Sequence, residues 1–593
     1  MKHSIFSTRI IAVLLYIILG LLCYKPQVNS AQSNFNIVLI TIDTLRADHL
    51  SCYGYERKTS PNIDKIADKG FIFKRAVAPW PATVPSMASL FTSTYPTNHG
   101  VLYGRLAKIH PNVFKQYETN VNHVMPDELT TLAEILKIHG YTTFGVSSNL
   151  LLDEKTGFAI GFDYFEHRDG SKANDTNKIV YSFEDEIKNS DKFFLWVHYM
   201  DPHLPYRPRN PWVEQYTSKS LTAKLNLFKK SYRELMRFVP KLKKDPQALT
   251  NLIALYDSEI NFMDFYLGEL IQKLDLDKDT LIIVTSDHGE EFLEHKYLTH
   301  GNNLHKETIH IPLIVKLPNS AKKETVTKYV NLVDIMPAIL QLLEINPPEQ
   351  VLGKSFFEKK GLLPQFKKIL FGKDTLDCTF SEISKVNVLK TIMTPEYKYI
   401  YDYKSKKGLL YDMKVDPLER ENIINRKTNQ SIQLKERLTN WASNLKKYSS
   451  KGHLFPLTPE EKEKLEAIGY LQVTDDIDKD GIPDNDDNCP YVSNPTQEDT
   501  YPPGGNGIGD ACECEGDFDC DGDVDDIDAA LFKADFGRNQ DKNPCTNDNP
   551  CNGDLDCDGD VDWSDAEKFR EDYGKRSSDN PCPACDEGSY CVY

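Results

Sequence analysis

The segment Asn36-Ile37-Val38-Leu39-Ile40-Thr41-Ile42-Asp43 is an almost unbroken apolar run that ends in a carboxylate. Such a run is typical of a parallel strand that is buried on both faces. Three further runs of this kind occur, at 141–147, 193–198 and 281–287. Helical patterns lie between them, for example at 131–139 and 254–274. The alternation predicts an α/β domain with a mainly parallel central sheet flanked by helices.

Charged and polar residues stand at the ends of these predicted strands. Asp43, His198 and Asp287 are placed there, and His288 follows directly. Ligands of parallel sheets bind at the carboxyl ends of the strands. Two aspartates and a histidine, together with a hydroxyl group, would enclose one divalent cation.

The hydroxyl comes from the segment Ala82-Thr-Val-Pro-Ser-Met-Ala-Ser-Leu-Phe-Thr92. Thr83 stands just before Pro85, which we expect to begin a helix. The N-terminus of a helix favours anions and lowers the pKa of a hydroxyl group. A bound metal would further favour the Thr83 alkoxide, so this residue is the predicted nucleophile.

The Thr83 segment and the motif Asp287-His288-Gly289-Glu290 resemble the type I sulfatase family of the alkaline phosphatase superfamily. The resemblance extends in order from about Asn36 to Asn422 and ends in a hairpin-like stretch. It implies the alkaline-phosphatase-like fold with a small C-terminal sheet subdomain. It also implies a hydrolase of sulfuric or phosphoric ester bonds, with Asp43, Thr83, Asp287 and His288 at the metal.

The chain departs from the family pattern at several positions of the site. The family nucleophile is a Cys or Ser that is oxidised to formylglycine, whereas Thr83 cannot be converted in this way. Met87 stands where the family has arginine, and Thr44 where it has a second aspartate. In place of a Gly-Lys-x-His segment, Ser147 and Asn149 are expected to give neutral hydrogen bonds to the substrate.

Three histidines receive roles from the resemblance. His203 lies in a Pro-His-x-Pro segment, which implies contact with the substrate anion, and His198 is a second substrate-binding candidate. His300 stands where related phosphonate and phosphodiester hydrolases place a lysine, so it is the predicted general acid. The expected cation is calcium, manganese, zinc or magnesium. A histidine ligand and the missing aspartate favour the last three.

These observations predict an exported, metal-dependent ester hydrolase with a threonine nucleophile. Two alternatives stay open. One is a phosphodiesterase, phosphonate monoesterase or phosphotransferase of the same superfamily, and the other is a catalytically weak protein that binds anions or glycans. The expected substrate is a sulfated or phosphorylated ester of a glycan or lipid, and no nucleic-acid partner is expected.

Both ends of the chain indicate a destination outside the cytoplasm. Residues 1–30 read as a signal peptide, with an uncleaved anchor as the alternative. Ten of the 13 cysteines lie between Cys489 and Cys591, which suits disulfides in an oxidising compartment. The periplasm, the cell surface and the extracellular space are the expected locations.

Residues 475–593 hold 34 acidic and 8 basic residues, whereas residues 1–474 hold 54 acidic and 62 basic residues.

The acidic tail carries patterns of calcium-binding loops. Residues 476–490 resemble a thrombospondin type-3 repeat, which gives Asp478, Asp480 and Asp484 as ligands. Residues 516–528 recur as 553–565, each with aspartate at loop positions 1, 3, 5, 9 and 12 and glycine at position 6. Helices are expected at 529–536 and 566–573, and the pair resembles a dockerin, which implies a cohesin-like partner. The predicted ligands are Asp517, Asp519, Asp521, Asp525 and Asp528 in the first loop, and Asp554, Asp556, Asp558, Asp562 and Asp565 in the second.

The predicted organisation follows from these segments. The expected parts are a signal peptide (1–30), a catalytic domain (31–345), a C-terminal subdomain (346–450), a linker (451–474), a thrombospondin type-3-like repeat (475–512) and a dockerin-like pair of loops (513–593).

Overall fold

The fold is described from a computed structural model of the chain. It covers residues 35–102, 124–207, 209–217, 235–236, 238–357, 378–384 and 388–448, and in the tail 495–496, 524, 526–539, 553, 555 and 560–573. The chain divides into two compact units, Met1–Tyr470 and Leu471–Tyr593. The predicted signal peptide, the thrombospondin type-3-like ligands Asp478, Asp480 and Asp484, and all ten tail cysteines lie outside the described residues.

A central sheet organises the first unit. Among the described residues its strand order is β11-β2-β10-β6-β1-β5-β3-β4, with β9 paired to β2. The bounds are β1 Asn36–Ile42, β2 Phe71–Val77, β3 Thr142–Ser147, β4 Tyr164–His167, β5 Phe193–Tyr199, β6 Thr280–Ser286, β9 His310–Ile311, β10 Leu313–Lys316 and β11 Glu324–Asn331. From β6 to β4 the strands are parallel, whereas β10 is antiparallel to both of its neighbours. The sheet is therefore mixed, with the predicted parallel strands at its centre.

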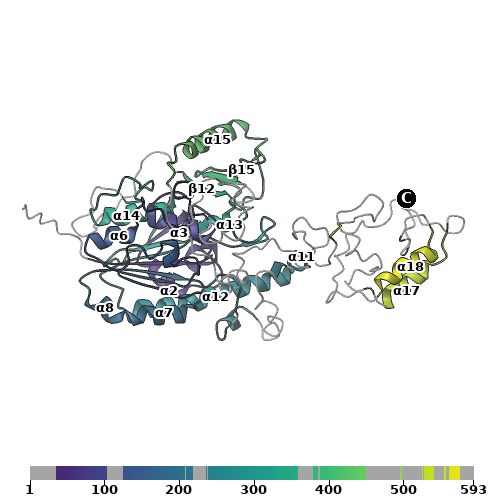
Figure 1. The fold of residues 1–593 in the computed structure, drawn as a ribbon, viewed down its shortest axis with the longest axis horizontal. Helices are drawn as coiled ribbons and strands as arrows, with labels where there is room; N and C mark the ends of the chain where they lie inside the picture. The colour runs from purple at the N-terminus through teal and green to yellow at the C-terminus, as the bar shows by residue number, and fades with distance from the viewer. Residues whose placement is uncertain are drawn as a thin grey trace, which may run out of the picture. The chain divides into compact units, whose positions relative to one another are not determined.

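Helices cover both faces of this sheet, as Figure 1 shows. One layer contains α2 (Pro61–Ala67), α7 (Ala173–Ser182) and α12 (Pro246–Lys273), and the other contains α3 (Thr83–Thr92), α6 (Leu132–Ile138) and α14 (Ile335–Leu342). Strands β5 and β6 are buried along their whole length because both faces are covered. This burial explains why these strands read as continuous apolar runs.

The first unit also contains several short helices and a two-stranded hairpin. The remaining helices are η1 Ala47–His49, η2 Ser51–Tyr53, α4 Pro96–His99, η4 Glu154–Thr156, α8 Glu184–Asn189, η5 Val213–Gln215, α11 Val239–Lys244, α13 Lys306–Ile309 and η7 Leu332–Asp334. A short hairpin of β7 (Glu291–Phe292) and β8 (Leu298–Thr299) follows β6. Within the described residues, none of the helices combines the length and apolar character that a membrane crossing requires.

A second sheet forms the C-terminal subdomain of the first unit. Its antiparallel strands are β12 (Thr379–Ser384), β13 (Val388–Met393), β14 (Tyr397–Asp402) and β15 (Gly408–Asp412), in that order. Helix α15 (Thr428–Ser443) packs on it through Leu434 and Leu438. The hairpin-like stretch at the end of the resemblance is thus β14 and β15.

The described part of the tail contains two packed helices, α17 (Asp526–Asp535) and α18 (Trp563–Asp572). Both begin three residues earlier than predicted, so Asp528 and Asp565 lie in their first turns rather than before them. The rings of Phe532 and Phe569 stack with centroids 5.0 Å apart. Asp528, Asp562 and Asp565 are described; the other predicted ligands of these two loops lie outside the described residues.

Candidate active site

Two neighbouring strands bring the aspartates of the site together. Ile42 in β1 is paired with Ser286 in β6, so Asp43 and Asp287 leave the sheet at the same level. The backbone N–H of Thr44 donates to Oδ1 of Asp287 over 3.2 Å, which fixes one carboxylate beside the other. On the opposite side of β1, Thr41 is paired with His198 of β5. The predicted meeting of strand ends is therefore present.

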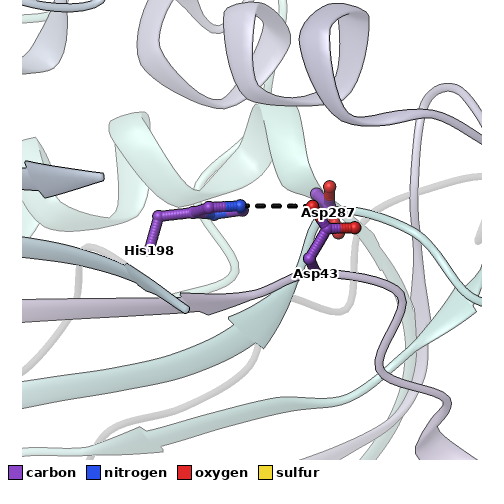
Figure 2. A group of neighbouring side chains, drawn as sticks. All are labelled: Asp43, His198 and Asp287. Atoms are coloured by element: carbon purple, nitrogen blue, oxygen red, sulfur yellow. Dashed lines mark ion pairs between the residues drawn. The ribbon is translucent and has the colours of Figure 1, made fainter. Parts of the chain in front are cut away.

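Asp43, His198 and Asp287 form a group that could hold a metal ion. One ligand atom from each lies within 4.8 Å of the others, and all three residues are fully buried (Figure 2). His198 Nε2 lies 3.4 Å from Asp43 Oδ2. Asp43 Oδ1, Asp287 Oδ2 and His198 Nε2 have no hydrogen-bond partner. Buried polar atoms of this kind are costly unless something occupies the space between them, and a cation fits that requirement.

His288 lies two residues after the end of β6 and contacts the same group. Its Nδ1 lies 2.9 Å from the Gly289 carbonyl, which can only accept, so Nδ1 carries the hydrogen. The lone pair of Nε2 then lies 3.4 Å from Asp287 Oδ2 and 3.7 Å from Asp43 Oδ1. Burial lowers the pKa of His288, which favours this neutral ring. Two carboxylates and two imidazoles suit a transition metal better than calcium.

The two carboxylates differ in their protonation. Burial opposes the charge on Asp43, but His203, His198 and His288 outweigh it and hold the pKa of Asp43 well below its usual range. Burial, and then the charge of Asp43, raise the pKa of Asp287 to about 7. In the absence of a cation, Asp287 therefore tends to hold a proton near neutral pH. A divalent cation would displace that proton, because metal ligands bind in their deprotonated form.

Thr83 is the first residue of α3. The prediction that this helix begins at Pro85 is wrong by two residues. Proline fits here because the first-turn N–H groups of a helix have no partner within the helix. The Thr83 hydroxyl lies 3.2 Å from His288 Nε2 and 3.4 Å from Asp43 Oδ2. The predicted nucleophile thus stands at a helix N-terminus beside the candidate metal position.

Two predicted substrate-binding residues are used within the protein. Asn149 donates from Nδ2 to Asp43 Oδ2 over 2.8 Å, so it orients a metal-ligand candidate. The Ser147 hydroxyl accepts the backbone N–H of Asn149 over 3.3 Å and supports that turn. His198, also predicted to bind substrate, lies with Asp43 and Asp287 in the group that could hold a metal ion, and its substrate contact stays a prediction.

His203 and His300 lie on the remaining side of the site. Nδ1 of the buried His203 donates to the Leu204 carbonyl over 2.6 Å. The His300 ring lies 5.1 Å from that of His203 and 4.3 Å from that of His288. His300 therefore lies beside the other histidines of the candidate site, and its role as proton donor stays a prediction.

Sequence reasoning missed two residues of the site. Thr41 accepts a hydrogen bond from Trp196 Nε1 over 2.9 Å, and its hydroxyl lies 2.9 Å from His198 Nδ1. Its inward position in β1 was visible, but its partner on β5 was not. Glu290 Oε1 lies 3.0 Å from His300 Nδ1. A carboxylate two residues after His288 was the available signal, and it was not given a role.

The fold and this site together define the class of protein: it is a hydrolase of sulfate or phosphate esters, built on a mixed sheet flanked by helices. Residues 35–345 match the family model "Sulfatase", and residues 294–444 match that of the N-sulphoglucosamine sulphohydrolase C-terminal region. The chain belongs to the sulfatase family. Divalent-metal use is a property of that family, and the Asp43, His198 and Asp287 group is consistent with it.

Several proteins of known name are similar to this chain. The chain is 25% identical to an arylsulfatase of Clostridium perfringens, over 68% of this chain and 92% of that one. It is 24% identical to the multifunctional alkaline phosphatase superfamily protein PehA of Trinickia caryophylli, over 65% and 91%. Its fold is similar to a phosphonate monoester hydrolase of Agrobacterium radiobacter, with a TM-score of 0.52, 18% identity and coverage of 69% and 95%.

Proposed function

We propose that this protein is an exported, metal-dependent ester hydrolase in which Thr83 takes the place of formylglycine as the nucleophile. One observation carries the proposal. The Thr83 hydroxyl stands at the N-terminus of α3, within 3.4 Å of both His288 Nε2 and Asp43 Oδ2. A hydroxyl in that position is next to a proton acceptor and next to the proposed cation.

The residues around Thr83 would share the work of the reaction. Asp43, His198, Asp287 and His288 would hold the cation, which when bound lowers the pKa of a hydroxyl and neutralises ester oxygens. Asp43 Oδ2 is the nearest anionic acceptor for the Thr83 proton. His203 and the first-turn N–H groups of α3 would bind the remaining ester oxygens. Manganese, zinc or magnesium fits this donor set better than calcium.

Phosphodiesters and phosphonate monoesters are the second candidate substrates, and phosphoryl transfer belongs with them. The observation that favours them is Met87, fully buried in α3 where the family resemblance places arginine. A sulfate monoester presents only charged oxygens beyond the scissile bond, whereas a phosphodiester has a second organic arm that suits an apolar wall. Relatives named PehA and phosphonate monoester hydrolase support this reading.

Substituting Thr83 tests the nucleophile. Thr83→Val keeps the shape but removes the hydroxyl, so we expect kcat/KM to fall at least ~10³-fold, whereas Thr83→Ser should retain activity. Thr92→Val is a matched control, because Thr92 is a buried threonine of the same helix whose hydroxyl bonds Ala88 and Thr94. Turnover of aryl sulfate, phosphodiester and phosphonate substrates would identify the bond. Equal rates for wild type and Thr83→Val would exclude Thr83 as the nucleophile.

We also propose a location and an attachment for the protein. The N-terminal pattern supports export to the periplasm, the cell surface or the medium. The duplicated loops support calcium binding in the tail and a cohesin-like partner. N-terminal sequencing of the protein recovered from each cell fraction tests export. Calcium-dependent retention of the full chain on an immobilised cohesin module tests the partner, and retention that is unchanged by chelator would count against it.

A further inference from the structure

The β7–β8 hairpin brings Glu290 and His300 face to face. Its register pairs Glu291 with Thr299, so the residues just outside the hairpin, Glu290 and His300, lie opposite each other. His300 Nδ1 lies 3.0 Å from Glu290 Oε1. A contact between residues ten positions apart is thus built into the backbone of the hairpin.

The backbone around Glu290 is firmly held. The N–H of Gly289 donates to the Thr308 carbonyl over 2.9 Å. A Cβ atom at Gly289 would lie 2.0 Å from the Glu307 carbonyl oxygen, so only glycine permits this close approach. On the other side, Arg46 Nη1 donates to the Glu290 carbonyl over 3.0 Å. Because the chain is fixed at both points, the buried Glu290 carboxylate has a fixed position.

This position determines which nitrogen of His300 can act on a substrate. A carboxylate oxygen accepts, so the hydrogen on Nδ1 of His300 is directed to Glu290, and any proton given to a substrate comes from Nε2. The His300 side chain is 14% exposed, whereas His288 is fully buried. His300 therefore lies on the solvent side of the histidine group, where a leaving group would depart.

We infer that Glu290 is the positioning residue of a Glu290–His300 pair whose Nε2 proton is given to the leaving group. The inference rests on the proposed function. Thr83 Oγ1 gives its proton to Asp43 Oδ2 as it forms its bond to sulfur or phosphorus, and the bond from the sulfur or phosphorus to the leaving oxygen breaks. The leaving oxygen keeps the electron pair and takes the Nε2 proton, which leaves a neutral ring still bonded to Glu290. Water then attacks the sulfur or phosphorus of the Thr83 ester and gives one proton to His300. The bond to Thr83 Oγ1 breaks, and this oxygen takes back its proton from Asp43.

The neighbouring Glu291 shows what a purely structural carboxylate looks like in this hairpin. Its Oε1 accepts the N–H groups of His295 and Tyr297, and its Oε2 accepts Asn303 Nδ2 over 2.5 Å. Glu290, by contrast, has only Oε1 engaged with His300, and its buried Oε2 has no hydrogen-bond partner. A structural role does not account for that unsatisfied atom.

The leaving group provides the test. A 4-nitrophenyl ester departs without a proton, whereas a phenyl ester needs one, and general acid catalysis contributes about 10²–10⁴-fold. For Glu290→Gln we expect kcat/KM to fall about 10²-fold on the phenyl ester and by no more than about 3-fold on the 4-nitrophenyl ester. His300→Gln should show the same selective loss. The double variant should be no worse than His300→Gln alone, because the two residues act as a unit.

Two comparisons keep the outcome clear. Glu291→Gln, the matched control, should change both esters equally, since Glu291 bonds only hairpin residues and Asn303. Equal loss on both esters for Glu290→Gln, with unchanged metal content and thermal midpoint, would overturn the pair while leaving Thr83 untouched. Wild-type protein that cleaves none of these esters would overturn the proposed function and the pair together.

Discussion

Asn149 donates a hydrogen bond from Nδ2 to Oδ2 of Asp43 over 2.8 Å, and its Oδ1 accepts the N–H of Leu151 over 3.0 Å. The second bond sets the orientation of the amide, because a backbone N–H must meet an oxygen. Asp43 is thereby held with Oδ1 toward the candidate metal position. Residues that orient metal ligands in this way contribute strongly to affinity.

Replacing Asn149 should therefore weaken metal binding more than it weakens the fold. For Asn149→Ala we expect about a 10–100-fold rise in the dissociation constant of the active-site metal. Metal titration of chelated protein, followed by calorimetry or by recovery of activity, measures it. The chain offers a matched control in Asn62, whose Nδ2 donates over 3.0 Å to the buried Asp264. Asn62→Ala should lower stability and leave metal affinity unchanged; equal effects of both variants would contradict the assignment.

The strand positions of the site could be predicted from the sequence, but the partners of the side chains could not. Asp43 and Asp287 end apolar runs, and parallel strands must bring such ends to one edge of the sheet. His198 also ends such a run, but its contact with Asp43 follows from the strand order, because β5 adjoins β1 and places the ring against Asp43. Asn149 lies beyond β3, and only the path of that turn directs its amide inward. Strand neighbours and turn geometry are long-range properties, which a local pattern does not contain.

Thr44 should control the choice of metal. It has a φ of 55°, unusual for a β-branched residue, and stands where the family resemblance has a second aspartate. After chelation, wild-type activity should be restored by manganese or zinc more than by calcium, because two histidines are among the proposed ligands. Thr44→Asp should shift reactivation toward calcium by adding a carboxylate. Reactivation, rather than metal uptake, is the proper measurement, since it would not count calcium taken up by the proposed loops of the tail. Preferential reactivation of the wild type by calcium would refute the expected donor set.

Glu419 should make the free energy of unfolding decrease at acidic pH. Both of its oxygens lie 2.8 Å from Lys398 Nζ in β14, and His305 Nδ1 lies 3.1 Å from Oε2, so it links the catalytic domain to the second sheet. Burial opposes its charge, but Lys398 and His305 outweigh burial and lower the pKa of Glu419 to about 2. Because the pKa of Glu419 is lower in the folded state than in the unfolded state, its ionised form stabilises the folded protein above about pH 4.5. This contribution is lost as the pH falls from about 4.5 to about 2.

The lowered pKa of Glu419 predicts a measurable pH dependence of the free energy of unfolding. Glu419→Gln should lower the free energy of unfolding at neutral pH by on the order of 3 kcal/mol, because Lys398 is left buried without its carboxylate. It should also remove part of the loss seen between pH 5 and pH 3 in urea denaturation. Glu396→Gln is the control, since Glu396 and its partner Lys414 are both well exposed. An acid slope that is the same in the wild type and in Glu419→Gln would contradict the prediction.

The tail should depend on calcium for its packing. Five described residues form its core, namely Val524, Phe532, Leu555, Val561 and Phe569. So small a core buries little apolar area to offset the conformational entropy that is lost when two loops become ordered. Asp565 closes the second loop, because its carboxylate accepts the N–H groups of Leu555 over 2.7 Å and of Asp562 over 2.8 Å. Oxygen atoms of Asp560, Asp562 and Asp565 lie within 4.8 Å of one another, close enough to share a cation.

We expect calcium to protect the amides of α17 and α18 from hydrogen exchange, and chelator to remove that protection without unfolding the catalytic unit. Asp565→Ala should abolish the protection and leave ester hydrolysis unchanged. Glu567→Ala, which removes an exposed acid two residues further along the same helix, should keep it. Because charge neutralisation alone would affect both variants similarly, a difference between them identifies a defined loop site. Protection that is the same with and without calcium would mean that the tail packs by its small core alone.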